Sequence, residues 1–322
     1  MKALVYNNGL KLDKNYPNPD VKDNEVLIKT TIVGICNTDY EITKGYMGYQ
    51  GVLGHEFVGI VEKVGANVDK SWIGKRVVGE INLACNDCNW CHRSLQRHCP
   101  NRQTLGIYKK DGCFSEYFTL PYQNILEVKD SISDEIAVFT EPLAAAYEII
   151  EQVHFKPNDR VAVVGDGKLG LCISTIFNAM NIDFTHIGKH ADKLELSKKM
   201  GAKTKLLSEI DNNDIKSYDV VVEATGSTGG FETSANLTKP RGILVLKSTI
   251  TAKEGLNLSG IVVDEITIIG SRCGQFKPVL RLMEKGRIDT KPLISGIYSV
   301  DDFEEAFKKN SDKNSIKILV KF

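Results

Sequence analysis

The feature that most constrains this chain is the segment VAVVGDGKLG at residues 161–170. An apolar run, typical of a buried parallel strand, leads into Gly165, Gly167 and Gly170 in G-x-G-x-x-G spacing. In this context the first glycine allows a tight turn, the second lets the backbone approach a pyrophosphate, and the third lets helix and strand pack closely. The N-terminus of the following helix would face the phosphates. The segment therefore predicts a dinucleotide site; a glycine-rich turn without a ligand is the alternative.

The rest of the chain divides into two regions of different pattern. From KPNDR onward, residues 156–274 alternate apolar strands with helix-length segments, which indicates a doubly wound parallel sheet. Residues 1–155 hold short β-like runs punctuated by Gly and Asn, typical of a sandwich or barrel. Because 322 residues are more than one core usually fills, we expect an α/β protein of two domains.

The second strand of the parallel region bears on the choice of cofactor. An Asp or Glu at its end normally bonds the ribose 2′-hydroxyl of NAD, but that position, 18 residues past Gly170, holds Gly188. Lys189, His190 and Lys193 follow it. A missing carboxylate removes repulsion against a 2′-phosphate, and nearby cations attract one. The segment predicts a preference for NADP(H), with NAD(H) still possible if these are only solvated surface charges.

Four cysteines lie close together in CNDCNWCHRSLQRHC. Cys85, Cys88, Cys91 and Cys99 can close a tetrahedral site around Zn²⁺ within one loop, which is what a structural zinc site needs. An iron–sulfur cluster is the alternative, although its usual spacings differ. A zinc finger that binds nucleic acid is disfavoured, because no reading helix and no broad basic surface accompany the loop.

Composition narrows the possible partners and the compartment. The chain has 41 basic and 41 acidic residues, so we expect no nucleic-acid partner. Its N-terminus lacks the apolar core of a signal peptide, and no apolar run reaches membrane-spanning length. We therefore expect a cytoplasmic protein with no membrane partner. In the reducing cytosol, eight cysteines are better explained by metal binding or catalysis than by disulfides.

A second set of polar residues is ambiguous residue by residue. Cys36 in VGICNTDY is compatible with a core thiol, a nucleophile or a metal ligand. His55 and Glu56 lie between apolar strands, and Glu141 precedes a proline where it would favour a helix N-terminus. Together these residues offer Cys, His and Glu, a donor set that suits a catalytic zinc with an open position.

These motifs, taken together, resemble a known superfamily. The chain is similar to the zinc-containing medium-chain dehydrogenases/reductases, which include zinc alcohol, polyol and threonine dehydrogenases. The similarity rests on GICNTD (34–39), LGHEFVGIV (53–61), the cysteine loop (85–99), DGCFSEYFTLP (111–121), EPLA (141–144), GDGKLG (165–170), VEATG (222–226) and GSRCG (270–274). It spans nearly the whole chain, and the combination is specific although the single motifs are not.

The resemblance implies two zinc ions per chain. Cys36 and His55 match catalytic zinc ligands, and Glu141 matches the third ligand of polyol-dehydrogenase-like members. Glu56 is expected near the metal as an alternate or exchanging ligand. The cysteine loop would hold the structural zinc.

The resemblance also implies how the reaction proceeds. Asp39 matches a carboxylate that orients His55, and Thr38 matches the hydroxyl that passes the substrate proton onward. The zinc would polarise the alcohol oxygen while a hydride passes to the nicotinamide. Many relatives end the proton relay on a His where this chain has Glu41. The expected activity is hydride transfer between NADP(H), or NAD(H), and an alcohol or polyol or its carbonyl product.

The expected architecture is a GroES-like β-barrel catalytic domain plus a Rossmann dinucleotide-binding domain. The first comprises residues 1–155, completed by 275–322, and the second comprises 156–274, with the active site in the cleft between them. By resemblance, homodimers or homotetramers form through the second domain. The expected cofactor contacts are Gly165, Gly167, Lys168, Leu169, Gly170, Gly188, Lys189, His190, Lys193, Thr225, Gly226, Ser271 and Arg272.

Two other functions remain possible for such a chain. A zinc-free enone or quinone reductase of the same superfamily would generally lack both the Cys/His/Glu set and the cysteine loop. A non-catalytic or nucleotide-sensing protein would not need Thr38 beside a full ligand set. The segment between Cys36 and His55, with Tyr46, Met47 and Tyr49, looks shorter than usual, so the resemblance does not identify the alcohol.

Overall fold

The computed structural model describes residues 1–249 and 255–322, which form two compact units. Unit 1 comprises Met1–Glu141, Phe276–Gly286 and Thr290–Phe322, and unit 2 comprises Pro142–Gln275 and Arg287–Asp289. Residues 142–155, which the sequence assigned to the first domain, group with unit 2 instead. The sequence pattern changes only at the end of a helix that already belongs to the second unit.

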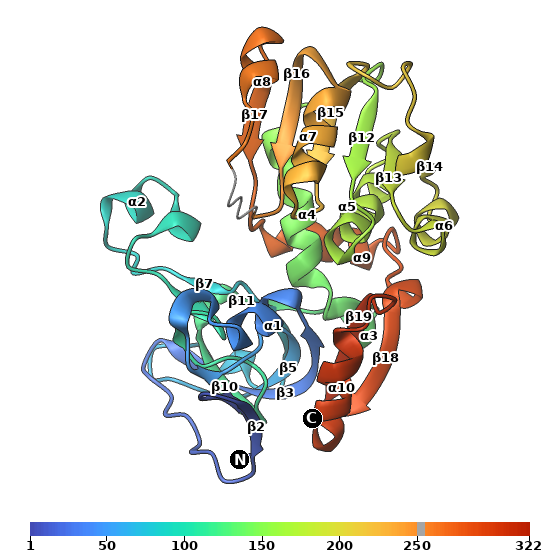
Figure 1. The fold of residues 1–322 in the computed structure, drawn as a ribbon. Helices are drawn as coiled ribbons and strands as arrows, with labels where there is room; N and C mark the ends of the chain where they lie inside the picture. Colours follow the sequence, from blue (N-terminus) through green and yellow to red (C-terminus); the bar gives the residue numbers. More distant parts are fainter. Residues whose placement is uncertain (250–254) are drawn as a thin grey trace. The chain divides into compact units, whose positions relative to one another are not determined.

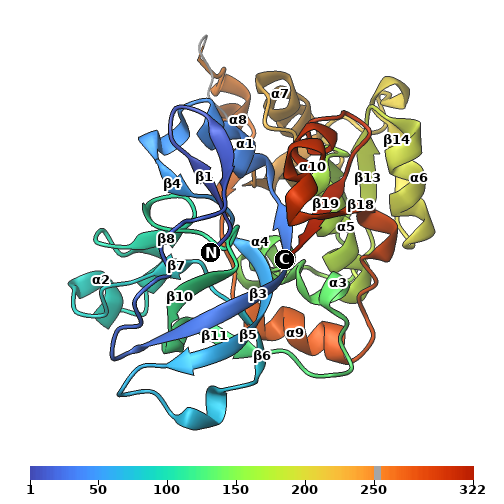
Figure 2. The ribbon, with the colours of Figure 1, turned by 90° about the horizontal axis from the view of Figure 1, so that it is seen from below.

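Unit 1 is built on mostly antiparallel sheets, in agreement with a GroES-like fold, and only the pairs β18–β19 and β8–β9 are parallel among the described strands (Figures 1 and 2). One sheet has the order β2-β1-β4, a second has the order β11-β6-β5-β3-β19-β18 with β10 also pairing with β3, and a third has the order β7-β8-β9. The strands are β1 (Ala3–Tyr6), β2 (Leu10–Asp13), β3 (Glu25–Ile35), β4 (Gly51–Val52), β5 (Glu56–Val64), β6 (Arg76–Gly79), β7 (Asn82–Leu83), β8 (Gln103–Leu105), β9 (Lys109–Lys110), β10 (Tyr117–Pro121), β11 (Ile125–Glu127), β18 (Ile294–Ser299) and β19 (Lys317–Lys321).

Strand β3 is the centre of the largest sheet. Its apolar residues Val26, Ile28, Val33 and Ile35 are buried in one core with residues of β5, β10 and β19. β19 pairs with β3 although it lies near residue 320, so residues from both ends of the chain share one sheet. The helices of this unit are α1 (Asn37–Thr43), α2 (Asn89–His92), α3 (Asp134–Ala137), α9 (Phe276–Glu284) and α10 (Phe303–Asn310).

Unit 2 contains the predicted doubly wound parallel sheet. Its strands have the order β14-β13-β12-β15-β16-β17, which Figure 1 shows from right to left. All five pairings are parallel. The strands are β12 (Val161–Val164), β13 (Thr185–Gly188), β14 (Lys203–Leu206), β15 (Tyr218–Glu223), β16 (Thr238–Leu246) and β17 (Thr267–Gly270). The helices are α5 (Lys168–Ala179), α6 (Ala191–Lys199), α7 (Thr228–Leu237) and α8 (Ser259–Val263), joined by α4 (Thr140–Gln152) at the start of the unit.

The order of the strands reverses direction at β12. The chain runs outward from β12 to β13 and β14, and then returns to the other side of β12 to form β15, β16 and β17. Ligands of open parallel sheets bind at such a switch point, beyond the carboxyl ends of the strands. The glycine-rich turn follows β12 directly, so the fold puts it at this point.

The longest described helix, α4, has 13 residues. About 20 apolar residues are needed to cross a bilayer. Within residues 1–249 and 255–322, no helix is both long and apolar enough to do so.

Helix α4 is held in unit 2 by a close approach that can be tested. A Cβ at Gly274 would lie 1.9 Å from the Ala144 carbonyl oxygen, and Gln152 Nε2 donates to the Gly270 carbonyl at 3.2 Å. We expect Gly274→Ala to lower the free energy of unfolding by about 1–3 kcal/mol in urea titrations, because the added methyl has no room. Gly260→Ala, where a Cβ meets nothing within 4 Å, is the matched control and should leave stability unchanged or slightly raised. Equal stability of both variants would contradict the packing.

Candidate functional site

The register of two strands brings three potential metal ligands together in unit 1. Cys36 follows β3 as the residue that precedes α1, while His55 and Glu56 stand at the start of β5. β3 and β5 are antiparallel with Gly34 opposite Glu56, so the end of one strand lies beside the start of the other. One ligand atom from each of Cys36, His55 and Glu56 lies within 4.8 Å of the others.

Asp39 links the thiol and the imidazole of this cluster. It is fully buried, and its Oδ2 accepts a hydrogen bond of 2.8 Å from the Cys36 N–H. Its Oδ1 lies 3.3 Å from His55 Nδ1, without the alignment of a hydrogen bond. Burial lowers the pKa of His55, but the charges of Asp39 and Cys36 raise it and prevail, so the pKa lies well above its usual value. Surroundings that favour a proton on the imidazole also favour a cation beside it.

Glu56 forms a buried ion pair that the sequence did not reveal. Its Oε2 lies 2.5 Å from Lys317 Nζ on β19, and the two side chains are only 1% and 5% exposed. A Cβ at Gly34 would lie 2.3 Å from this same oxygen, so only glycine leaves room for the carboxylate. Oε1 of Glu56 is buried and lacks a hydrogen-bond partner in the described residues. One oxygen is therefore neutralised by Lys317 while the other remains available to a ligand.

The other residues predicted for this site differ in how they lie relative to the cluster of Cys36, His55 and Glu56. Cys36 Sγ lies 3.6 Å from Thr38 Oγ1, so the hydroxyl adjoins the cluster. Glu41 forms an exposed ion pair with Lys44 at 3.0 Å. Glu141 is the second residue of α4 and is half-buried; it is not one of the three residues that cluster.

Cys113, for which the sequence suggested no role, lies next to the cluster. Its buried thiol contacts the Glu56 carbonyl oxygen at 3.7 Å. Burial raises the pKa of this thiol well above its usual value, and the charges of Asp39 and Glu56 raise it further. Cys113 is therefore a neutral thiol packed behind the ligands. The sequence did not indicate this position, because Cys113 is far from Cys36, His55 and Glu56 along the chain.

A zinc ion fits the donor set of the cluster. Thiolate, imidazole and carboxylate are the ligand types that Zn²⁺ takes in proteins, and three of them leave a fourth position for another molecule. The buried, unpartnered oxygen of Glu56 is consistent with such a ligand.

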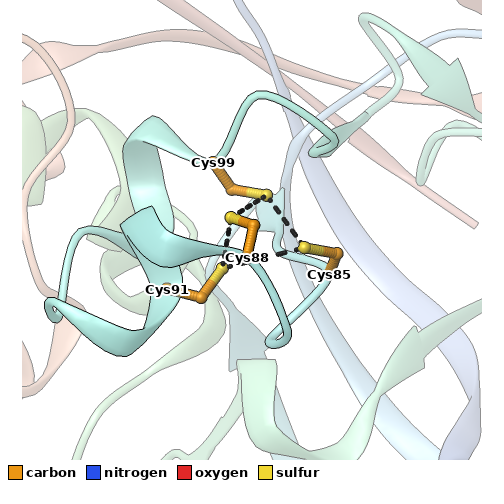
Figure 3. Close-up of side chains that lie close together, drawn as sticks. All are labelled: Cys85, Cys88, Cys91 and Cys99. Atoms are coloured by element: carbon orange, nitrogen blue, oxygen red, sulfur yellow. Dashed lines mark hydrogen bonds between the residues drawn. The ribbon is translucent and has the colours of Figure 1, made fainter.

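The four cysteines of the loop between β7 and β8 converge on one point (Figure 3). The sulfur–sulfur distances are 3.4 Å for Cys85–Cys99, 3.5 Å for Cys88–Cys91, 3.8 Å for Cys88–Cys99 and 3.9 Å for Cys85–Cys91. Four thiolates at about 2.3 Å from a tetrahedral Zn²⁺ would be about 3.8 Å apart. The loop therefore fits a closed zinc site.

The pKa values of two of these thiols are shifted in opposite directions. A hydrogen bond from the Asp87 N–H, with a smaller contribution from Cys99, lowers the pKa of Cys85 to about 6. Burial, followed by the neighbouring sulfurs, raises the pKa of Cys91 to about 12. The thiolate of Cys85 thus forms readily at neutral pH, whereas burial and the neighbouring sulfurs oppose the ionisation of Cys91.

The glycine-rich turn of unit 2 has the geometry of a dinucleotide site. Gly165 has φ +119°, a Cβ at Gly170 would lie 1.7 Å from the Gly165 carbonyl oxygen, and a Cβ at Gly167 would meet nothing within 4 Å. No side chain of the described residues caps the N-terminus of α5 at Gly167. A helix N-terminus without a side-chain cap suits a phosphate, which is the role that the sequence predicts for this turn.

The remaining predicted cofactor contacts lie at the same edge of the parallel sheet. Lys168 and Leu169 open α5; Gly188, Lys189, His190 and Lys193 follow β13; Thr225 and Gly226 follow β15; and Ser271 and Arg272 follow β17. Two buried residues that sequence reasoning missed organise this edge. Glu223 accepts from the N–H groups of Thr225 and Gly226, and Lys247 donates to Ser271 Oγ at 3.0 Å.

The Glu56–Lys317 pair generates a prediction about stability. Replacing one partner leaves a buried charge uncompensated, so we expect Lys317→Met to lower the free energy of unfolding by about 3–5 kcal/mol. Lys321→Met is the control on the same strand, because its pair with Glu135 is 56% and 31% exposed and is worth about 1 kcal/mol or less. Denaturant titration of both variants measures the difference. Equal losses would show that the buried pair is not important for stability.

Comparisons with known proteins agree with this geometry. Residues 22–130 match the family model described as alcohol dehydrogenase GroES-like domain, and residues 134–322 match glucose dehydrogenase C-terminus. D-arabitol-phosphate dehydrogenase of Enterococcus avium is 30% identical over 94% of this chain and 91% of its own length.

Solved structures show the same fold across the whole chain. An alcohol dehydrogenase from Escherichia coli CFT073, complexed with NADH, is 26% identical with a TM-score of 0.93, covering 100% of this chain and 99% of its own. A zinc-binding dehydrogenase from Sinorhizobium meliloti 1021, bound to NADP, is 25% identical with a TM-score of 0.91 over 100% and 99%. Since one family model alone spans more than half of the residues, this chain belongs to the zinc-type medium-chain dehydrogenase/reductase superfamily and is an oxidoreductase of the alcohol dehydrogenase kind.

Proposed function

We propose that this protein transfers a hydride between a nicotinamide dinucleotide and an alcohol or polyol, or the corresponding aldehyde or ketone. The observation that carries the proposal is the cluster of Cys36, His55 and Glu56 within 4.8 Å. Support also comes from the similar proteins, which include a D-arabitol-phosphate dehydrogenase, an alcohol dehydrogenase with NADH bound and a zinc-binding dehydrogenase with NADP bound.

Cys36 and His55 would hold the catalytic zinc, together with a carboxylate. When bound, this ion supplies Lewis-acid polarisation of the substrate oxygen. Glu56 is favoured as the carboxylate by its position in the cluster and its unpartnered Oε1. Glu141, the polyol-dehydrogenase-like choice, remains the alternative third ligand. Lys317 would hold the other oxygen of Glu56 in place.

The other side chains would position groups and move the proton. Asp39 fixes the position of Cys36 through its backbone N–H and stands beside the His55 ring, which limits how the imidazole turns. Thr38 would relay the proton of the substrate hydroxyl, giving up its own hydroxyl proton to the solvent as it accepts that one, since its oxygen adjoins the ligand cluster and its side chain is only half-buried. The nicotinamide, when bound, accepts or supplies the hydride.

The cysteine loop would hold a second, structural zinc. Support comes from the convergence of all four sulfurs and from the lack of a fifth donor in this group of the described residues. A closed site of this kind stabilises the loop and leaves no position for a substrate.

Metal analysis of two variants tests both zinc assignments. We expect two zinc ions per chain in the wild type and one in both Cys36→Ser and Cys99→Ser. Cys36→Ser should lower kcat/KM by at least about 100-fold, because losing several kcal/mol of polarisation has that size. Cys99→Ser should mainly lower thermal stability, so the two variants control each other. Turnover that survives Cys36→Ser would exclude this mechanism.

A homodimer or homotetramer is proposed on the exposed apolar residues of unit 2. Among the described strands β17 is the last of its sheet, and Ile268 on it is 38% exposed. On the preceding helix α8, Val262 and Val263 are 75% and 78% exposed. An open strand edge beside large exposed apolar side chains suits pairing with a second copy.

A cytoplasmic location likewise remains a prediction.

The oligomer proposal predicts the effect of charge at this surface. We expect the double substitution Val262→Asp with Val263→Asp to reduce the mass in light scattering from a multimer to a single chain, because the paired surface would gain repelling charges. Ile73→Asp, at a residue of unit 1 that is 49% exposed, is the control and should keep the wild-type mass. A wild type that is already a single chain would refute the proposal.

Charges of opposite sign near the end of β13 act on the preference between NADP(H) and NAD(H). Lys189 and Lys193 favour a 2′-phosphate, as the sequence predicted. The carboxylate of Asp166, which lies against Gly188, opposes one.

A further inference from the structure

We infer that Asp166, in the glycine-rich turn, supplies the carboxylate that β13 lacks at Gly188, and thereby selects NAD(H) over NADP(H). The inference rests on the proposed dehydrogenase function and specifies its cofactor. It reverses the preference that the sequence of residues 188–193 suggested.

The first observation is the space above Gly188. A Cβ at this position would lie 2.5 Å from Asp166 Oδ2, 2.6 Å from its Cβ and 2.7 Å from its Cγ. Gly188 does not have a positive φ, so the backbone does not require glycine here. Glycine is instead what makes room for the Asp166 side chain. The carboxylate therefore stands on the glycine-rich turn, and the place that its oxygen occupies is close to the end of β13.

The second observation is that Asp166 is fixed. Its side chain is buried, and Oδ2 accepts a hydrogen bond of 2.6 Å from the His190 N–H. The His190 ring nitrogen Nδ1 lies 3.1 Å from both carboxylate oxygens. Burial raises the pKa of Asp166, but the His190 hydrogen bonds and charge outweigh it, so the pKa lies below its usual value. Asp166 therefore carries a negative charge at neutral pH.

The charge of Asp166 lies where it can act on the ribose 2′-hydroxyl of the cofactor. In parallel sheets of this type, an acid at the end of the second strand bonds the ribose 2′-hydroxyl, next to the turn that holds the pyrophosphate. Asp166 lies between Gly165 and Gly167 of that turn and contacts the end of the second strand. An ionised carboxylate there can accept a hydrogen bond from a 2′-hydroxyl but repels a 2′-phosphate.

The opposing cations are weaker in effect because of where they lie. Lys189 is exposed and Lys193 is half-buried at the surface, so water and salt screen their charges. The carboxylate of Asp166 is buried and is screened less. His190 partly offsets it when protonated, but its ring is half exposed. The repulsion of a 2′-phosphate should therefore prevail.

Binding measurements test the inference without depending on turnover. Calorimetry with NAD⁺ and NADP⁺ on the zinc-loaded wild type should give a Kd for NAD⁺ at least about 10-fold lower. In Asp166→Asn, which keeps the size and an acceptor for the His190 N–H, the ratio of the two Kd values should move toward NADP⁺ by at least about 10-fold. The ratio of kcat/KM values should follow. Asp192→Asn removes an exposed charge from nearby α6 and should leave both ratios unchanged.

A second variant covers the case in which Asp166→Asn does not fold. Combining Asp166→Gly with Gly188→Asp returns the carboxylate to the strand and should restore the preference for NAD⁺. A wild type that binds NADP⁺ as tightly as NAD⁺ would overturn the inference. So would equal weakening of both cofactors in Asp166→Asn, or an equal shift in Asp192→Asn. If both cofactors bind with the expected ratio but no alcohol is oxidised, only the proposed function fails; if neither binds, both fail.

Discussion

The antiparallel pairing of β3 with β5 and β19 is the constraint on which the catalytic unit depends. It sets Gly34 opposite both Glu56 and Leu319, so three distant parts of the chain meet at one point. The position of Cys36 is set by the end of β3, and the position of His55 is set by the start of β5. Lys317 then meets Glu56 because β19 lies on the other side of β3. A shift of one residue in this register would turn each side chain to the opposite face and disperse the site.

In the second unit, parallel pairing has the corresponding effect. All carboxyl ends of the strands face the same edge, so the turns after β12, β13, β15 and β17 gather there. Buried charges organise this edge at close range, with Glu223 binding the N–H groups after β15 and Lys247 reaching the segment after β17. The sheet thus supplies the arrangement, and a few buried polar residues fix the individual loops.

The sequence predicts best those features whose residues lie close together along the chain. The cysteine loop and the glycine-rich turn each lie within a short segment of the chain, and the four cysteines of the loop lie together in the structure. The residues that were missed act across strands. The role of Lys317 is visible only once the pairing of β19 with β3 is known, because this pairing puts it beside Glu56. The role of Asp166 is visible only once its side chain is found in the space that a side chain at position 188 would fill. The boundary near 155 differed from the structure for a related reason, because α4 packs on Gly274 far along the chain.

The order of the segments along the chain has a consequence for biosynthesis. Glu56 precedes Lys317 by 261 residues, and the whole continuous part of unit 2 is encoded between them. At about 5–20 residues per second, a ribosome needs on the order of tens of seconds to join the two. Unit 2 can therefore fold while Glu56 still lacks its counter-ion. In the nascent chain the nucleotide-binding turn can form before the ion pair between Glu56 and Lys317 does.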